Sequence, residues 1–158
     1  SPTWSQNGIW QAYYETCTPT APPPNADPLK QWCDEPALVY KTTWRGEHYY
    51  SHNESIPILE SDHLKHFIAY HGDDPFYFMV DRTRYCSGNM TSPNFGEECT
   101  GKGSSIVNEV KGHYKGPEYD KYFDHELIWD QNLKFIMIKL YPLGKPGARD
   151  KKAASAGD

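Results

Sequence analysis

The chain has 158 residues, a length that makes a single domain with one hydrophobic core. Aromatic residues reach 15%, and 16 basic residues stand against 21 acidic ones, which gives a net charge of −5. The negative charge disfavours nucleic acid as a partner, because phosphate binding needs a basic surface. No apolar run approaches the ~20 residues of a membrane span. This composition is typical of an aromatic-rich, secreted β domain.

The first predicted strand is the short aromatic segment Gly8–Thr16, which opens with Gly8-Ile9-Trp10. A G-x-W triplet at this place resembles lipocalins and their calycin relatives, in which it opens the first strand and the Trp closes one end of a β-barrel. The resemblance implies a barrel around a ligand cavity, with Trp10 at the end of that cavity.

A proline-rich segment follows at residues 18–30 and contains five prolines. Such a segment is extended and polyproline-like, and it cannot form a central strand or a helix interior. It lies between Cys17 and Cys33, which indicates a tethered surface loop. The four cysteines allow three pairings, and closure of short local loops favours Cys17–Cys33 and Cys86–Cys99.

Seven further segments have strand character. They are residues 37–43, 47–51, 65–70, 76–82, 104–111, 125–129 and 133–141. Turn residues between neighbouring segments predict three hairpins, within 37–51, 65–82 and 125–141. In the last strand Phe135 and Met137 fall on one face and Ile136 and Ile138 on the other, so it is expected to be central. Helix signals are confined to single turns at 61–65 and 119–123.

Eight strands and little helix allow two ways of closing the fold. One is an up-and-down antiparallel barrel around a cavity, and the alternative is a two-sheet β-sandwich with a filled core. We therefore predict an all-β domain over residues 1–142, with two disulfides and about eight antiparallel strands. Residues 143–158 have no large apolar side chain after Leu143, which predicts a disordered C-terminal tail.

Three features predict a secreted, extracellular glycoprotein. The even number of cysteines is the first. The second is a pair of N-glycosylation sequons, at Asn53 and Asn89. The third is the start at Ser1-Pro2 without Met, which we interpret as a mature N-terminus left after removal of a signal peptide.

A barrel interior predicts a small amphipathic molecule as the ligand, because aromatic walls combine apolar surface with hydroxyl and indole groups. Alternate residues of the predicted strands give the expected lining. It comprises Trp10, Tyr40, Tyr70, Phe78, Trp129 and Phe135. Trp10 and Trp129 would cap or line the same cavity.

Two other functions fit the same composition. One is an effector or immune-evasion protein that binds a host protein through exposed aromatic residues. The aromatic candidates are Trp4, Trp32, Trp44 and Tyr114. The other is a small enzyme, a hydrolase or isomerase, that uses a histidine and a carboxylate for acid–base catalysis. The candidates for that chemistry are Tyr49, His66, Tyr70, Asp81 and Glu126.

No motif in the sequence identifies a cofactor, so none is expected. His63 and His66 lie three residues apart in a predicted turn, but no zinc-binding signature accompanies them. Solvated loop histidines are the default interpretation, and the sequence leaves open whether these two take part in a metal or catalytic site.

Overall fold

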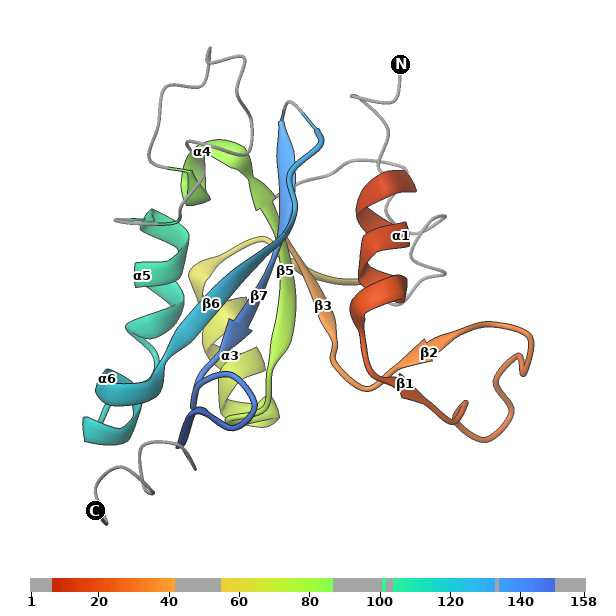
Figure 1. The fold of residues 1–158 in the computed structure, drawn as a ribbon, viewed down its shortest axis with the longest axis horizontal. Coiled ribbons are helices and arrows are strands. Elements are labelled where there is room, and N and C mark those ends of the chain that lie inside the picture. Colours follow the sequence, from red (N-terminus) through yellow and green to blue (C-terminus); the bar gives the residue numbers. More distant parts are fainter. Residues whose placement is uncertain (1–6, 42–54, 87–100, 102–103, 133, 150–158) are drawn as a thin grey trace.

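The computed structural model describes residues 7–41, 55–86, 101, 104–132 and 134–149. In this part of the chain an open, mixed β-sheet lies between helices on both of its faces, and a small hairpin stands apart from the sheet (Figure 1).

The sheet has five strands, of which two pairs are parallel and two are antiparallel. Its order is β4 (Ser55–Ile58), β3 (Ala37–Tyr40), β5 (Phe76–Asp81), β7 (Phe135–Tyr141) and β6 (Asp124–Trp129). Strand β3 runs parallel to both β4 and β5, and β7 runs antiparallel to both β5 and β6. The predicted hairpin over 125–141 is confirmed, and so is the expectation that its second strand lies inside the sheet.

Helices cover the two faces of the sheet unequally. On one face lie α3 (Ser61–His71), α4 (Arg82–Tyr85) and α5 (Ser105–Lys111), whose apolar residues join one large core cluster with the strands. On the other face lies α1 (Asn7–Thr16), which forms a smaller cluster with the sheet. A short helix, α6 (Pro117–Tyr122), precedes β6.

Strand β7 contributes to both cores, as its two apolar faces predicted. Phe135 and Met137 belong to the core beneath α1, whereas Ile136 and Ile138 belong to the opposite core. Side chains of one strand alternate between the two faces of a sheet, so the two pairs lie on opposite faces of this sheet.

The prediction of an all-β barrel is wrong, and the sandwich alternative is wrong as well. Three segments expected as strands are helical, namely 8–16 in α1, 65–70 in α3 and 104–111 in α5. The sheet has two edges, β4 and β6, so it does not close around a lumen. The hairpin expected over 65–82 is replaced by α3 followed by β5.

A different hairpin lies outside the main sheet. It consists of β1 (Pro19–Thr20) and β2 (Trp32–Cys33), joined by a loop that projects from the body of the molecule (Figure 1). The disulfide Cys17–Cys33 closes its base, which confirms the first predicted pairing. Cys99 lies outside the described residues, so the pairing Cys86–Cys99 stays a prediction.

The C-terminal segment beyond β7 contacts α6. The Arg149 guanidinium lies 2.8 Å from a carboxylate oxygen of Glu118, and the Gly144 amide donates to the Tyr141 carbonyl at 3.1 Å. The last nine residues of the segment expected as a tail, 150–158, lie outside the described residues, as do Asn53 and Asn89. Within the described part of the chain, every helix is too short or too polar to cross a membrane.

Candidate functional site

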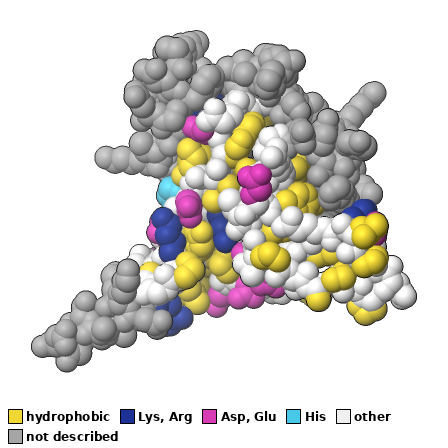
Figure 2. All heavy atoms as spheres, turned by 45° about the vertical axis from the view of Figure 1, so that its right-hand side comes forward, with side chains coloured by type: hydrophobic (Ala, Val, Ile, Leu, Met, Phe, Trp, Pro, Cys, Tyr) yellow, Lys and Arg dark blue, Asp and Glu magenta, His cyan; other side chains and the backbone are white. Residues whose placement is uncertain are grey.

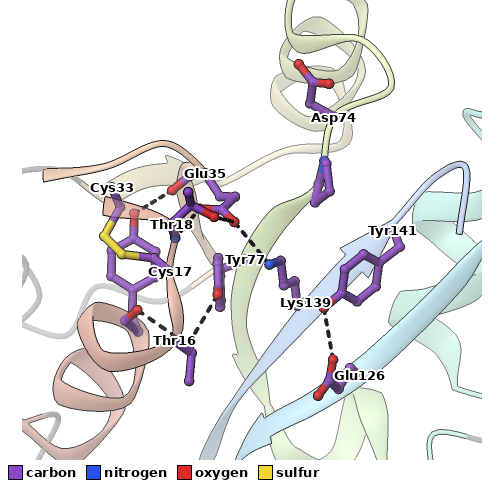
Figure 3. A network of polar contacts seen from close by, with 12 residues as sticks. Thr16, Cys17, Thr18, Cys33, Glu35, Asp74, Tyr77, Glu126, Lys139 and Tyr141 are labelled. Atoms are coloured by element: carbon purple, nitrogen blue, oxygen red, sulfur yellow. Dashed lines mark hydrogen bonds and ion pairs between the residues drawn. A yellow bond between two sulfur atoms is a disulfide. The ribbon is translucent and has the colours of Figure 1, made fainter. Parts of the chain in front are cut away.

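The face of the sheet beneath α1 changes from apolar to polar along β7. Phe135 and Met137 are packed under the helix, and the next two side chains on the same face are Lys139 and Tyr141. Helix α1 ends at Thr16, and Lys139 and Tyr141 lie on the sheet beyond that end. They form a polar floor that the helix does not cover (Figure 3).

Cross-strand neighbours complete this floor. Lys139 is opposite Tyr77 of β5 on one side and opposite Glu126 of β6 on the other. Directly opposed residues in a sheet carry their side chains on the same face, within contact distance. The segment between β2 and β3 adds Glu35, whose carboxylate faces Lys139 (Figure 3).

A buried ion pair lies at the centre of the site. The Lys139 Nζ is 3.1 Å from Glu35 Oε2, and the two side chains are only 12% and 9% exposed. Thr18 donates its backbone N–H to Glu35 Oε1 at 2.8 Å and its hydroxyl to Glu35 Oε2 at 2.9 Å. The carboxylate therefore accepts three hydrogen bonds.

These donors keep Glu35 ionised. Burial works to raise the pKa of Glu35, but the hydrogen bonds from Thr18 and Lys139 outweigh it, and the pKa lies below its ordinary value. Lys139 thus faces a permanent negative charge at neutral pH. Lys139 Nζ donates a hydrogen bond to this carboxylate, an arrangement suited to binding a polar group of a ligand.

Two tyrosines flank the ammonium group. The Lys139 Nζ lies 5.0 Å from the ring centre of Tyr77 and 5.1 Å from that of Tyr141, within the range of cation–π attraction. The Tyr141 hydroxyl donates to Glu126 Oε2 at 2.9 Å. Burial, followed by this bond to Glu126, raises the pKa of Tyr141, so its hydroxyl stays neutral.

A cleft of about 330 Å³ opens above this floor. Its lining comes from the α1–β1 and β2–β3 segments, the end of α3 and the turn that follows it, β7 and the C-terminal segment. The lining residues are Thr18, Asp34, Glu35, His71, Asp74, Pro75, Lys139, Tyr141 and Pro146. We call it the Lys139 cleft. Three carboxylates and one ammonium group thus lie beside the rings of a tyrosine and two prolines.

The six residues predicted to line a ligand cavity do not share one. Trp10 and Phe135 lie in the core beneath α1, and the half-buried Trp129 packs against that core. Tyr40 and Phe78 lie in the core on the opposite face. Tyr70 is 96% exposed on α3. The sheet itself separates the two buried groups, which is why no common cavity forms.

The residues considered for acid–base chemistry are also dispersed. His66 and Tyr70 are exposed on α3, Asp81 ends β5, and Tyr49 lies outside the described residues. Among the described candidates, Glu126 alone contacts a residue of the Lys139 cleft, because its carboxylate accepts the hydroxyl of Tyr141.

The histidines expected in a turn lie on α3. His63 Nδ1 accepts the Leu59 amide at 3.1 Å, and both His63 and His66 are exposed. Among the described residues, no group of three or more His, Cys, Asp or Glu side chains is close enough to hold a metal ion.

The aromatic residues considered for protein binding have different surroundings. Tyr114 is buried, and Trp32 is half-buried with its indole N–H donated to the Asp27 carbonyl at 3.2 Å. Trp4 and Trp44 lie outside the described residues.

Most of the Lys139 cleft was not identified from the sequence. One signal was available, because Lys139 interrupts the apolar face that Phe135 and Met137 begin. A charged residue on a strand expected to be buried on both faces indicates a partner elsewhere in the chain. The identity of that partner, Glu35, has no local signal.

No family model matches the chain, and no match was found among curated proteins or solved structures. The triplet Gly8-Ile9-Trp10, on which the resemblance to lipocalins rested, lies in the helix α1 rather than on a strand. The function is therefore inferred from the geometry of the site itself.

Proposed function

We propose that this protein is a secreted binding protein that holds a small amphipathic molecule in the Lys139 cleft. The observation that carries the proposal is the buried ion pair between Glu35 and Lys139 on the cleft floor. Burying two charges costs several kcal/mol per ion, and apolar replacement is often neutral or stabilising. A buried pair at the bottom of an open cleft is therefore better explained by recognition than by stability.

The polar end of the ligand is expected to be neutral and to carry hydroxyl groups. Lys139 donates one hydrogen bond to Glu35, and an ammonium group has three N–H donors, so donors are left for a ligand oxygen. Asp34 and Asp74 offer carboxylates to a ligand hydroxyl. An anionic head would be repelled by the three carboxylates of the cleft, and a cationic head would lie beside the Lys139 ammonium, whereas a neutral head meets neither repulsion.

The apolar end of the ligand has surfaces of its own. Pro75, Pro146 and the ring of Tyr141 line the cleft beside the charged groups. Small-molecule sites commonly combine such apolar walls with a few placed polar groups. Secretion is supported by the disulfide Cys17–Cys33, because disulfides persist in oxidising compartments.

The test compares three probes that share one tail and differ in the head: octyl glucoside, octanoate and octylamine, each below its micelle concentration. Binding is followed by the shifts of backbone amide signals in NMR spectra. We expect octyl glucoside to shift the signals of Thr18, Lys139 and Tyr141 more strongly than either charged probe does. Absence of shifts at these residues with all three probes would contradict the proposal.

Three variants distinguish the contribution of the buried ion pair to ligand binding from that of other charged residues. Lys139→Met should weaken octyl glucoside binding tenfold or more, because a lost hydrogen bond from a charged group is worth about 1.5–3 kcal/mol. Asp74→Asn removes one carboxylate charge from the cleft lining. It should leave the folded state intact, since no described residue hydrogen-bonds this carboxylate. Lys111→Met, in an exposed ion pair with Asp120, is the matched control and should bind as the unchanged protein does.

A second candidate function, recognition of another protein, is favoured by one side chain. Leu29 is 93% exposed on the projecting loop between β1 and β2, where hydrophobic side chains are visible on the surface (Figure 2). Affinity capture with the unchanged protein and with Leu29→Ser tests this candidate. A partner retained equally by both proteins would exclude Leu29 as the contact.

A further inference from the structure

Thr20 lies on the part of the molecule that is easiest to reach. It is the second residue of β1 in the hairpin that projects from the body, and both residues of β1 are exposed (Figure 1). Within the described residues, β1 pairs with β2 along one edge only, so its other edge faces outward. An enzyme that binds an extended chain could approach from that side.

The hydroxyl of Thr20 differs from those of the two preceding threonines. Thr16 donates its hydroxyl to the Ala12 carbonyl at 2.7 Å, and Thr18 donates its hydroxyl to Glu35 at 2.9 Å. No described residue is hydrogen-bonded to the hydroxyl of Thr20. Of these three nucleophilic oxygens, Thr20 Oγ1 is therefore the one that an enzyme can bind without breaking an internal contact.

Prolines on both sides hold the chain around Thr20 extended. Pro19 precedes it, and Pro22, Pro23 and Pro24 follow after one alanine. Each proline fixes its own φ angle and lacks an N–H group, so the segment cannot become helical. The chain then reverses at Asn25, whose φ is 68°, with the Ala26 amide donating to the Pro23 carbonyl at 3.1 Å.

We propose that Thr20 is an acceptor site for O-linked glycosylation. Threonine among prolines is the composition of O-glycosylated segments, and here the acceptor is exposed, extended and free of internal hydrogen bonds. The disulfide at the base of the hairpin is consistent with passage through an oxidising secretory compartment. The inference does not depend on the ligand proposed for the Lys139 cleft.

The reaction is a glycosyl transfer from a nucleoside diphosphate sugar. Thr20 Oγ1 attacks the anomeric carbon, forming a new C–O glycosidic bond, while the bond from that carbon to the diphosphate oxygen breaks. The nucleoside diphosphate leaves with the bonding electron pair, and the hydroxyl proton passes to a base or phosphate oxygen in the transferase. No oxidant or reductant is needed.

Two threonines provide comparisons within the chain. Thr18 has proline beside it, but its hydroxyl is bonded to Glu35. Thr83 is exposed, but it lies in the helix α4 with no proline next to it. If exposure alone decided the reaction, Thr83 would be modified, and if proline alone decided it, Thr18 would be modified.

The experiment treats the full, disulfide-bonded chain with a purified polypeptide N-acetylgalactosaminyltransferase and UDP-N-acetylgalactosamine. Intact mass and electron-transfer fragmentation then locate the sugar. We expect a mass increase of one N-acetylhexosamine, located on Thr20, and its complete loss in Thr20→Ala. The double variant Pro19→Ala/Pro23→Ala should lower the occupancy several-fold, and Thr83→Ala should leave it unchanged.

The same mass measurement and electron-transfer fragmentation are applied to protein secreted from mammalian cells, after enzymatic removal of N-linked glycans. An O-linked sugar on Thr20 there supports the inference. It is overturned by a sugar on Thr18 or Thr83 in place of Thr20, or by no incorporation at Thr20 in both preparations.

Discussion

Lys139 Nζ and Glu35 Oε2 lie 3.1 Å apart, although the two residues are 104 positions apart in the sequence. Glu35 also receives two hydrogen bonds from Thr18, the residue after the disulfide-bonded Cys17. One carboxylate thus connects the end of α1, the base of the hairpin and the interior strand β7. The stability of this junction and the shape of the Lys139 cleft therefore depend on the same ion pair.

Removing the ammonium group should destabilise the fold. Lys139→Met leaves the Glu35 carboxylate buried without its counter-charge, and breaking one side of a buried pair typically costs about 3–5 kcal/mol. We expect a loss near the lower end, about 3 kcal/mol, because Thr18 still donates two hydrogen bonds. Urea unfolding followed by tryptophan fluorescence measures the change.

The exposed pair between Lys111 and Asp120 provides the control for this measurement. Its Nζ–Oδ1 distance is 3.0 Å, close to that of the buried pair, but both side chains are open to solvent. Lys111→Met should change the free energy of unfolding by less than about 1 kcal/mol. Equal losses in the two variants would show that burial of the Lys139 pair has no energetic consequence.

The low pKa of Glu35 predicts a pH dependence of stability. Its pKa in the folded protein lies below the ordinary value near 4.5, so the folded state binds fewer protons than the unfolded state in this range. This contribution is complete above pH ~4.5 and is lost as the pH falls through the folded pKa. The difference in unfolding free energy between the unchanged protein and Glu35→Gln should therefore be largest near neutrality and shrink below pH ~4.5. A difference that stays constant down to pH ~2.5 would contradict the assignment.

The sequence predicted the inner strands of the sheet more successfully than the helices that pack on its two faces. Strand β7 was recognisable because both of its alternating faces are apolar, and its hairpin with β6 followed from the short turn between them. The helix α1 was missed because Trp and Tyr are common in strands, although the buried residues Ile9, Trp10 and Tyr13 have helical spacing.

The same conflict between residue type and spacing explains the error at α5. Its buried residues Ile106, Val107 and Val110 are β-branched, which favours a strand, but they recur at i, i+1 and i+4. The side chain of Ser104 caps this helix by accepting the Val107 amide at 3.2 Å. The spacing and the cap outweigh the intrinsic preference once the residues face a common core.

The Lys139 cleft was less predictable than the fold because its parts come from distant segments. The contact between Glu35 and Lys139 depends on the order of strands in the sheet, which no local pattern specifies. A predicted barrel placed Phe135 and Tyr40 around one lumen, whereas the open sheet puts them on opposite faces. An error in topology therefore displaced the whole predicted site, although most strands of the sheet were recognised.

The disulfide Cys17–Cys33 should stabilise the hairpin and the Lys139 cleft together. The two cysteines are 16 residues apart, and a closed loop of about this length contributes roughly 3 kcal/mol in the chain-entropy model. We expect Cys17→Ser/Cys33→Ser to lose about that much and to show faster hydrogen exchange at the Thr18 amide, which donates to Glu35. Unchanged exchange at Thr18 would show that the disulfide does not support the ion pair.

Non-reducing peptide mapping of the unchanged protein tests the second predicted disulfide, Cys86–Cys99.

Gly8 lets α1 approach β6 closely. A Cβ atom at this position would lie 2.6 Å from Cζ2 of the Trp129 ring, well inside a normal contact. Glycine within a helix costs about 1 kcal/mol relative to alanine, so its presence here is explained by packing rather than by helix formation. Gly8→Ala should therefore destabilise the protein by about 1–3 kcal/mol, as overpacking of a core contact does, despite the gain in helix propensity.

Two further variants test whether the clash is the cause. Gly112 has a helical φ of −59°, and a Cβ there would meet nothing closer than 3.4 Å, so Gly112→Ala should be neutral or stabilise by up to about 1 kcal/mol. Trp129→Leu removes the ring that Gly8→Ala would strike. If the clash is responsible, Gly8→Ala should cost clearly less in the Trp129→Leu background than in the unchanged protein. Additive losses in thermal or urea unfolding would instead attribute the effect of Gly8→Ala to the helix itself.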